Sequence, residues 1–305
     1  MSKKATTVEE QIEILKSRGM TISNEEKAKE HLLDIGYYRL GFYWYYFFED
    51  EETQTFYKGT DLTDAIDLYY LDVDLRNMLS KYIYRIEVHF RTQVVYFVSN
   101  KFKEDPIWFC NPGIVDNFRP DLYDTLKDKN VHIIKHHNKH PTDTNTYAPA
   151  WKNLEFLTFG QILNIYNSLR CEEVKSEIAN VYGLSDRRVR KKTKKKTIVI
   201  KNHKILRDYL AAILNIRNIC SHSGVLFDYK QPKGINSIPD NNYELKDGDL
   251  SSLYASIRLI SFILSKISLN RTLELIANID CELNKAIEKN PKLKNIIKSH
   301  AGFNI

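Results

Sequence analysis

The sequence predicts an all-α protein, and three observations lead to this fold class. Apolar residues recur at three- and four-residue steps through most of the 305-residue chain, the period of a helix that buries one face. Two capping boxes, Thr7-Val-Glu-Glu10 and Ser23-Asn-Glu-Glu26, mark the starts of two helices. Gly19 and Gly36 stand where these two helices should end, because glycine readily adopts the left-handed conformation of a helix end.

An aromatic run over residues 37–48 follows the second predicted helix, and Arg39 is its only charged residue. Both a helical and a strand period fit this run. Aromatic side chains bury large areas, so we expect core packing or a dimer surface here. Base stacking would instead need rings that stay exposed.

Residues 61–103 predict one long helix, or two helices with a break near Asp72. The apolar positions that step by three and four residues are Leu68, Leu71, Leu75, Leu79, Ile83, Ile86, Phe90, Val94 and Phe97. Glu87 and Arg91 are four residues apart and can pair on one helix face. We favour a surface ion pair of small energetic value for them.

The middle of the chain, residues 104–150, is irregular because five prolines interrupt it. His132 and His136 have the spacing of metal ligands on a helix, but no Cys, Asp or Glu lies between them. We therefore expect no metal site and favour a basic, phosphate-facing helix end. Amphipathic helices should follow over residues 151–169 and 172–182.

A basic run follows these helices, and no acidic residue interrupts it before Asp208. Such a run repels itself, so we expect a solvated or mobile loop over residues 186–204. It is also the kind of patch that binds a polyanion through phosphate contacts and counterion release. The candidate RNA contacts are Arg187, Arg188, Arg190, Lys191, Lys192, Lys194, Lys195 and Lys196.

The next predicted helix, residues 206–224, ends at Gly224 and combines two unlike faces. Its apolar stripe consists of Leu206, Tyr209, Ile213, Ile216 and Cys220. Its polar side carries Asp208, Asn215, Asn218 and His222. A helix this apolar must be buried, and buried polar groups need partners. Asn218 and His222 are i,i+4, so the Asn amide can fix the orientation of the imidazole.

Arg217 and His222 at the end of this helix have the chemistry to act on a phosphodiester. A guanidinium can hold a phosphate bidentately, and an imidazole can accept or donate the protons of a 2′-hydroxyl attack. The two residues are about 140° apart on an ideal helix, so they converge only if the last turn distorts or the Arg side chain swings around. One imidazole cannot easily serve as base and acid together, and two copies meeting across a twofold axis solve this simply. Arg91 would lean toward the same cleft.

The alternative is a capped, solvated helix end, because basic residues are favoured near helix C-termini. Beyond this helix we expect an irregular stretch over residues 227–249, helices over 250–268 and 269–288, and a final piece after Pro291. The predicted division is an N-terminal helical and aromatic segment 1–60, a helical core 61–270 and a C-terminal helical extension 271–305.

Composition restricts the class of protein. The chain is 43% hydrophobic and 28% charged, and its net charge of +6 merely permits an acidic partner. No apolar run of eighteen residues and no secretory signal is present, so we expect no membrane partner. Four widely separated cysteines predict a reducing cytoplasm with neither disulfides nor a zinc site. Phosphate loops, serine elbows and paired carboxylates are missing, and we expect no cofactor.

Several blocks of the chain, in order, resemble one family of bacterial proteins. Arg217-Asn-Ile-Cys-Ser-His222 resembles the Arg-Asn-x-Cys-Ala-His element of the Abi-like (abortive infection) proteins, a branch of the HEPN superfamily. Residues 35–43 resemble that family's Gly-Tyr-Tyr-Arg-Leu-Ser-Gly-Tyr block. The further blocks are Leu75-Arg76, Ile86-Glu87-Val88 with Arg91, Pro149-Ala-Trp151 with Glu155, and Leu157-Thr-Phe-Gly160. The resemblance covers roughly residues 8–227.

The resemblance implies an all-α, HEPN-type helical bundle with N-terminal and C-terminal helical extensions, which dimerises and cleaves RNA without a metal. Arg217 would hold the phosphate, His222 would act as acid and base, and Asn218 would orient His222. Cleavage would leave a 2′,3′-cyclic phosphate, in a phage-defence or toxin-antitoxin role that can involve a small noncoding RNA. Ser221, Ser223 and Gly224 depart from the family's usual residues. The alternative is a non-catalytic RNA-binding or dimerisation module.

Overall fold

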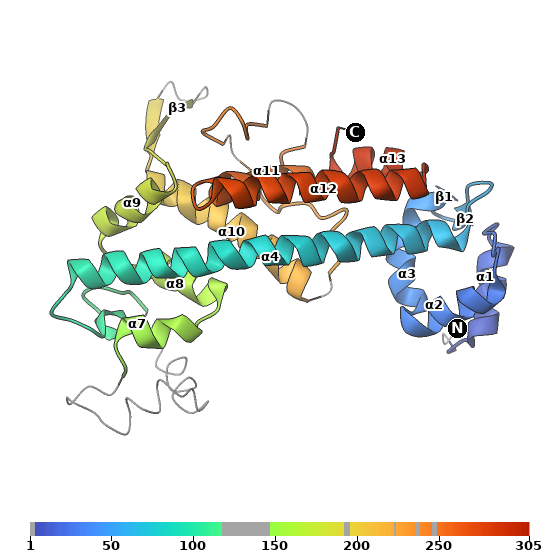
Figure 1. The fold of residues 1–305 in the computed structure, drawn as a ribbon, viewed down its shortest axis with the longest axis horizontal. Helices are drawn as coiled ribbons and strands as arrows, with labels where there is room; N and C mark the ends of the chain where they lie inside the picture. The colour runs from blue at the N-terminus through green and yellow to red at the C-terminus, as the bar shows by residue number, and fades with distance from the viewer. Residues whose placement is uncertain are drawn as a thin grey trace.

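The computed structural model describes residues 4–117, 147–191, 196–222, 224–235, 238–245 and 249–304, and the side chains of 189–198 lie outside this description. Helices dominate the described chain, and its only sheets are two antiparallel pairs of short strands (Figure 1). The predicted all-α class is therefore confirmed. His132 and His136, considered as metal ligands, fall outside the described residues.

One helix, α4 (Leu62–Lys101), runs the length of the molecule, and the other elements pack around it (Figure 1). The apolar stripe predicted for it is buried from Leu68 to Val94. The alternative of a break near Asp72 is wrong, because the helix is continuous through that position. Helix α12 (Leu269–Lys289) lies along α4, and α10 (Asn202–Ser221) and α11 (Leu253–Ser265) complete the central layer.

The N-terminal elements cluster at one end of α4 (Figure 1). They are α1 (Val8–Ser17), α2 (Glu25–Asp34), α3 (Tyr37–Trp44), a 3-10 turn (Tyr45–Phe47), and the strands β1 (Phe48–Asp50) and β2 (Thr55–Phe56). The capping box at Thr7 is confirmed. The second predicted box is off by one residue: Asn24 caps α2, while Ser23 bonds to Asp61 instead.

The aromatic run is helical as far as Trp44 and divides between two faces. Tyr43, Trp44 and Phe47 are buried, which confirms the expected core packing for this face. Tyr38 and Phe42 stay exposed on the other face. A dimer surface, the other possibility for this run, would therefore have to use the face that carries Tyr38 and Phe42.

The opposite end of α4 holds α7 (Ala150–Asn153), a 3-10 turn (Leu154–Phe156), α8 (Phe159–Ser168) and α9 (Glu172–Val181) (Figure 1). The single helix predicted over residues 151–169 is wrong. Leu157 is extended, and Thr158 caps a new helix in a reciprocal box with Gln161. Helix α9 agrees with its prediction and ends before Gly183, which has a φ of 68°.

On either side of residues 192–195, which lie outside the described part, the basic run forms the two paired strands of a hairpin, so the loop expected over 186–204 is wrong for the described residues. Strands β3 (Arg187–Lys191) and β4 (Lys196–Ile200) pair in antiparallel register, with Arg188 opposite Val199. The signal for the second strand was its β-branched ending, Thr197-Ile-Val-Ile200, which suits a strand despite the charges around it. Asp186 then accepts the backbone N–H of Asn202 and thereby joins the hairpin to the start of α10.

The C-terminal part returns to the first end of α4 through α13 (Leu293–Ile296) and a π-helical turn (Ile297–Ala301). Helix α11 begins at a Ser252 cap, and α12 matches its predicted range within a residue. The described portions of 227–249 contain neither helix nor strand, as expected. No helix in the described chain combines the length and apolarity that crossing a bilayer requires.

We expect Asp61→Ala to lower the free energy of unfolding by about 1–2 kcal/mol, because Asp61 caps α4 and also binds the Ser23 backbone. Burial acts to raise the pKa of Asp61, but hydrogen bonds from Ser23 and Thr63 outweigh it and hold that pKa below its ordinary 3.8. Stability from this group is therefore present above pH 3.8 and is lost as pH falls through the folded-state pKa. Urea unfolding should show a wild-type advantage that shrinks in acid; a constant gap would contradict the role of the charge.

Candidate functional site

Helix α10 presents the predicted site residues at its C-terminal end. It begins at Asn202, earlier than predicted, and ends at Ser221 with His222 as its C-cap. Gly224 does not provide the expected left-handed turn, since it is not among the residues of positive φ. Space is tight here instead: a Cβ at this position would lie 3.0 Å from a methyl of Ile219, which would have to shift slightly. The predicted apolar stripe is buried from Leu206 to Ile216.

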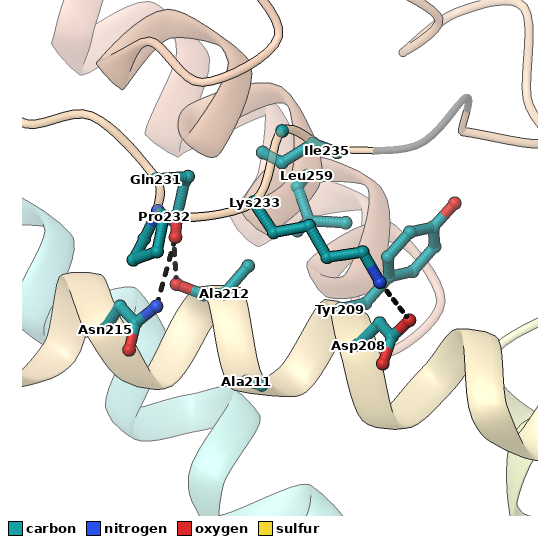
Figure 2. A pocket seen from close by; sticks show the side chains of 11 residues that line it. Asp208, Tyr209, Ala211, Ala212, Asn215, Gln231, Pro232, Lys233, Ile235 and Leu259 are labelled. Atoms are coloured by element: carbon teal, nitrogen blue, oxygen red, sulfur yellow. Dashed lines mark hydrogen bonds and ion pairs between the residues drawn. The ribbon is translucent and has the colours of Figure 1, made fainter.

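The polar side of α10 divides into a structural part and an open end. Asp208 pairs with Lys233 at 3.1 Å, and Asn215 donates to Gln231 at 3.2 Å. Gln231 in turn donates to the backbone of Ala212, so that the irregular segment after the helix is held against it (Figure 2). The small hollow here, of about 140 Å³, is lined by apolar side chains and by these polar ones, which bond to one another. These bonds hold the segment after α10 in place, and the hollow is not our candidate site.

Arg217 on the last turn of α10 forms a loose ion pair with a carboxylate of α4. Its Nε lies 3.8 Å from Oε2 of Glu87, and its Nη1 donates to Oδ1 of Asn218 at 3.4 Å. The Arg217 side chain keeps 29% of its surface exposed, whereas that of Glu87 keeps 9%. The Glu87 carboxylate thus attracts one edge of the guanidinium, while part of the group remains open to solvent.

Arg91 lies behind this pair and is buried. Its Nη2 donates to Glu87 at 3.1 Å and to the carbonyl of Leu157 at 2.9 Å, and its Nη1 donates to Glu155 at 3.4 Å. The predicted pairing of Glu87 and Arg91 is confirmed, but as a buried pair and not on the surface. Glu87 therefore joins two arginines, and Glu155 adds a second carboxylate.

His222 is exposed at the tip of α10. Its backbone N–H donates to the carbonyl of Asn218 at 2.9 Å. Within the described residues, no hydrogen bond or ion pair engages the imidazole, and the Asn218 amide turns to Arg217 instead. The proposed orienting contact between Asn218 and His222 is thus absent from this arrangement of the described chain.

The segment just after His222 is fixed by Asp72, a residue for which the sequence predicts no more than a possible helix break. The buried Asp72 carboxylate accepts bonds from the Tyr43 hydroxyl at 2.8 Å and from Arg76 Nε at 3.0 Å. It also accepts the backbone N–H groups of Leu226 and Phe227, at 3.0 and 2.7 Å. Burial raises the pKa of Asp72, against the effect of these donors. The spacing of Asp72 and Arg76, an acid and an arginine four residues apart among buried apolar positions, is the sequence signal that indicates this buried pair.

The basic hairpin stands at the other end of α10 from Arg217 (Figure 1). Fifteen residues separate Asn202 from Arg217, which is roughly 22 Å of helix at 1.5 Å per residue. Arg188 is exposed and Arg187 half-buried; Lys192, Lys194 and Lys195, and the side chains of Arg190, Lys191 and Lys196, lie outside the described part. The fold therefore brings Arg91 and Arg217 together but keeps the described basic residues apart from them.

Other reactive groups near the site are unsuited to catalysis. Burial raises the pKa of the Cys220 thiol to about 12, so this cysteine stays protonated. His89 bonds to the Tyr182 hydroxyl at 2.9 Å, and burial lowers its pKa. The described residues contain no cluster of three His, Cys, Asp or Glu side chains that could hold a metal ion.

Comparison with known proteins places the chain in a family. The family model for Abi-like protein matches residues 30–228, close to the range over which the resemblance was seen in the sequence. No curated protein and no solved structure matches the chain. The matched range contains α3, α4 and the whole of α10, and thus every residue joined to Arg217 or Asp72 above. The chain therefore belongs to the Abi-like protein family.

Proposed function

We propose that this protein is a metal-independent endoribonuclease of the HEPN type, acting in abortive infection as a phage defence. The Abi-like family membership carries the biological role. One observation carries the chemistry: a partly exposed guanidinium, ion-paired with the buried Glu87, and an exposed imidazole lie at the same helix end.

In the proposed reaction, the free edge of Arg217 binds the non-bridging oxygens of the scissile phosphate. The ribose 2′-oxygen attacks phosphorus, and the bond from phosphorus to the 5′-oxygen breaks. His222 accepts the 2′-hydroxyl proton or protonates the leaving oxygen. The products are a 2′,3′-cyclic phosphate and a 5′-hydroxyl, and no water enters the first step.

A second copy supplies the second imidazole in this proposal. A single His222 cannot be base and acid in one step, and its exposed position at the helix tip leaves it able to face its counterpart in a homodimer. The exposed Arg188 of the hairpin offers phosphate contacts farther along a bound strand, and a small noncoding RNA is the partner we propose for it.

Replacing His222 by alanine should reduce RNA cleavage by at least about 100-fold, the lower range for removal of a general acid–base group. The measurement is cleavage of total bacterial RNA in EDTA, with product ends identified by mass spectrometry. Because the side chain is exposed, the melting temperature should not change. His31→Ala, on α2 and remote from the site, is the matched control and should cleave like the wild type.

The competing function is a non-catalytic RNA-binding or dimerisation module. It predicts that His222→Ala keeps RNA retention and cellular toxicity unchanged. Toxicity that persists in a folded His222→Ala protein, or cleavage at the wild-type rate, overturns the nuclease proposal. A purified protein whose 260/280 nm absorbance ratio shows no RNA would point to a protein partner instead.

A further inference from the structure

A hollow beside Arg91 lies outside the phosphate site described above. It is lined by residues of α4, of α7 and of the 3-10 turn that follows α7. Its volume of about 360 Å³ falls in the usual range of ligand sites, roughly 300–1,000 Å³. Four of the lining residues are Arg91, Tyr96, Trp151 and Glu155.

Two aromatic rings of this hollow stay in contact with solvent. Trp151 is 54% exposed and Tyr96 is 60% exposed, and they come from different elements. The other two tryptophans, Trp44 and Trp108, are buried. A large ring left in water forgoes the free energy of burial, and exposed rings are what base stacking requires. The buried rings of α3, Tyr43 and Trp44, cannot stack on a base, whereas the exposed rings of this hollow can.

One buried donor of Arg91, a residue that lines the hollow, has no partner among the described residues. The Arg91 side chain is 8% exposed, and its Nε has no hydrogen-bond partner among the described residues. Its Nη1 is only loosely held by Glu155, at 3.4 Å, while the Glu155 side chain is 60% exposed. A buried donor without a partner is costly, and Arg91 shares the lining of the hollow with the acceptor-only carboxylate of Glu155.

The hollow adjoins the ion pair of Arg217. Arg91 binds Glu87, which in turn pairs with Arg217. Tyr96 is nine residues beyond Glu87 on α4, which is roughly 13 Å along the helix axis. A short stretch of single-stranded RNA spans this length, so one strand can place a phosphate at Arg217 and a base in the hollow.

We propose that the hollow binds a guanine base of the RNA strand, an inference that rests on the proposed function. The base stacks on Trp151 and Tyr96. Glu155 accepts bonds from the adjacent N1–H and N2–H groups of guanine, and Arg91 donates to its O6. Adenine, cytosine and uracil lack two adjacent donors on this edge, so a carboxylate that accepts one bond from them meets a repelling acceptor with its second oxygen.

A second copy of the chain fits this hollow less well than a base does. A protein surface that covers the rings would also bury the exposed Glu155 carboxylate, and charged groups need specific partners when they are desolvated. The heterocyclic edge of guanine supplies those partners while the face of the base stacks on the rings.

Fluorescence of the full-length His222→Ala protein tests this inference without any need for cleavage, since Trp151 is the exposed tryptophan among the three. Titration with single-stranded oligonucleotides that differ in one G-to-A exchange, and with GMP and AMP, should show quenching and at least about fivefold tighter binding of guanine, the discrimination expected of one bidentate pair. Glu155→Gln should reduce that preference to near unity. Trp151→Ala should lose most of the affinity for the oligonucleotide, and Trp151→Phe should retain it. Because both variants lack the Trp151 fluorescence, their affinities are measured by the anisotropy of a labelled oligonucleotide.

Tyr57→Ala is the matched control, because Tyr57 is as exposed as Trp151 but lies before α4. Equal affinities for guanine and adenine in the wild type, or unchanged affinity in folded Trp151→Ala, overturn the base site. A change in sedimentation without a change in RNA affinity would assign the surface to a second copy and also overturn it. Guanine binding without cleavage by the wild type would refute the nuclease and leave the base site standing.

Discussion

Asp72→Ala is expected to lower the free energy of unfolding by about 3–5 kcal/mol, the cost of removing one partner from a buried charged pair. Four donors lose their acceptor in this variant: the Tyr43 hydroxyl, Arg76 Nε, and the N–H groups of Leu226 and Phe227. Arg76 would remain buried as an unpaired cation. Typical domains have about 5–15 kcal/mol of stability, so much of the total would be lost.

Urea unfolding followed by circular dichroism measures this loss, and Asp74→Ala is the control. Asp74 is an exposed acid two residues away on the same helix, so its removal should change stability by less than about 0.5 kcal/mol. A cost below about 1 kcal/mol for Asp72→Ala would show that the carboxylate does not hold the segment after His222. Hydrogen exchange at Leu226 and Phe227 should accelerate in Asp72→Asn, which keeps the side-chain volume.

Arg217→Ala is expected to reduce RNA cleavage by about 10²–10³-fold, the cost of removing one preorganised donor group from a reacting oxyanion. Arg217→Lys should recover little of this activity, because a lysine cannot form the two parallel bonds of a guanidinium. The melting temperature should stay close to that of the wild type, since Arg217 is partly exposed and Glu87 keeps Arg91 as its partner.

Single-turnover cleavage with excess enzyme measures the chemical step in these variants. Arg271→Ala provides the matched control, because Arg271 is an exposed arginine paired with Glu274 on α12. Activity within threefold of the wild type in Arg217→Ala would remove this residue from the proposed chemistry. Loss of activity together with a lowered melting temperature would instead assign it a structural role.

Local sequence patterns predicted the helices of this fold well because their signals are short-range. The apolar stripe between Leu68 and Val94 gave α4, and the capping box at Thr7 gave α1. The pairing of Glu87 with Arg91 followed from their i,i+4 spacing. The basic hairpin was missed because charge density outweighed the β-branched ending of β4 in the prediction.

Contacts between distant segments could not be derived in the same way. Asp72 meets Leu226 and Phe227 across more than 150 positions, and no periodicity in either segment encodes that meeting. The burial of Arg91 likewise depends on the carbonyl of Leu157 from another element. The break at Thr158 was hidden because the apolar spacing continues across it, although the Thr-x-x-Gln signature was present.

The continuity of α4 has a mechanical consequence. Its 40 residues form a strut of roughly 60 Å that carries Asp72, Glu87 and Arg91 on one backbone. A tilt of α4 imposed near Tyr43 moves Asp72 and Glu87 together, because no hinge divides them. A displacement of the α3 end of α4 therefore reaches both the segment behind His222 and the ion pair of Arg217 at once.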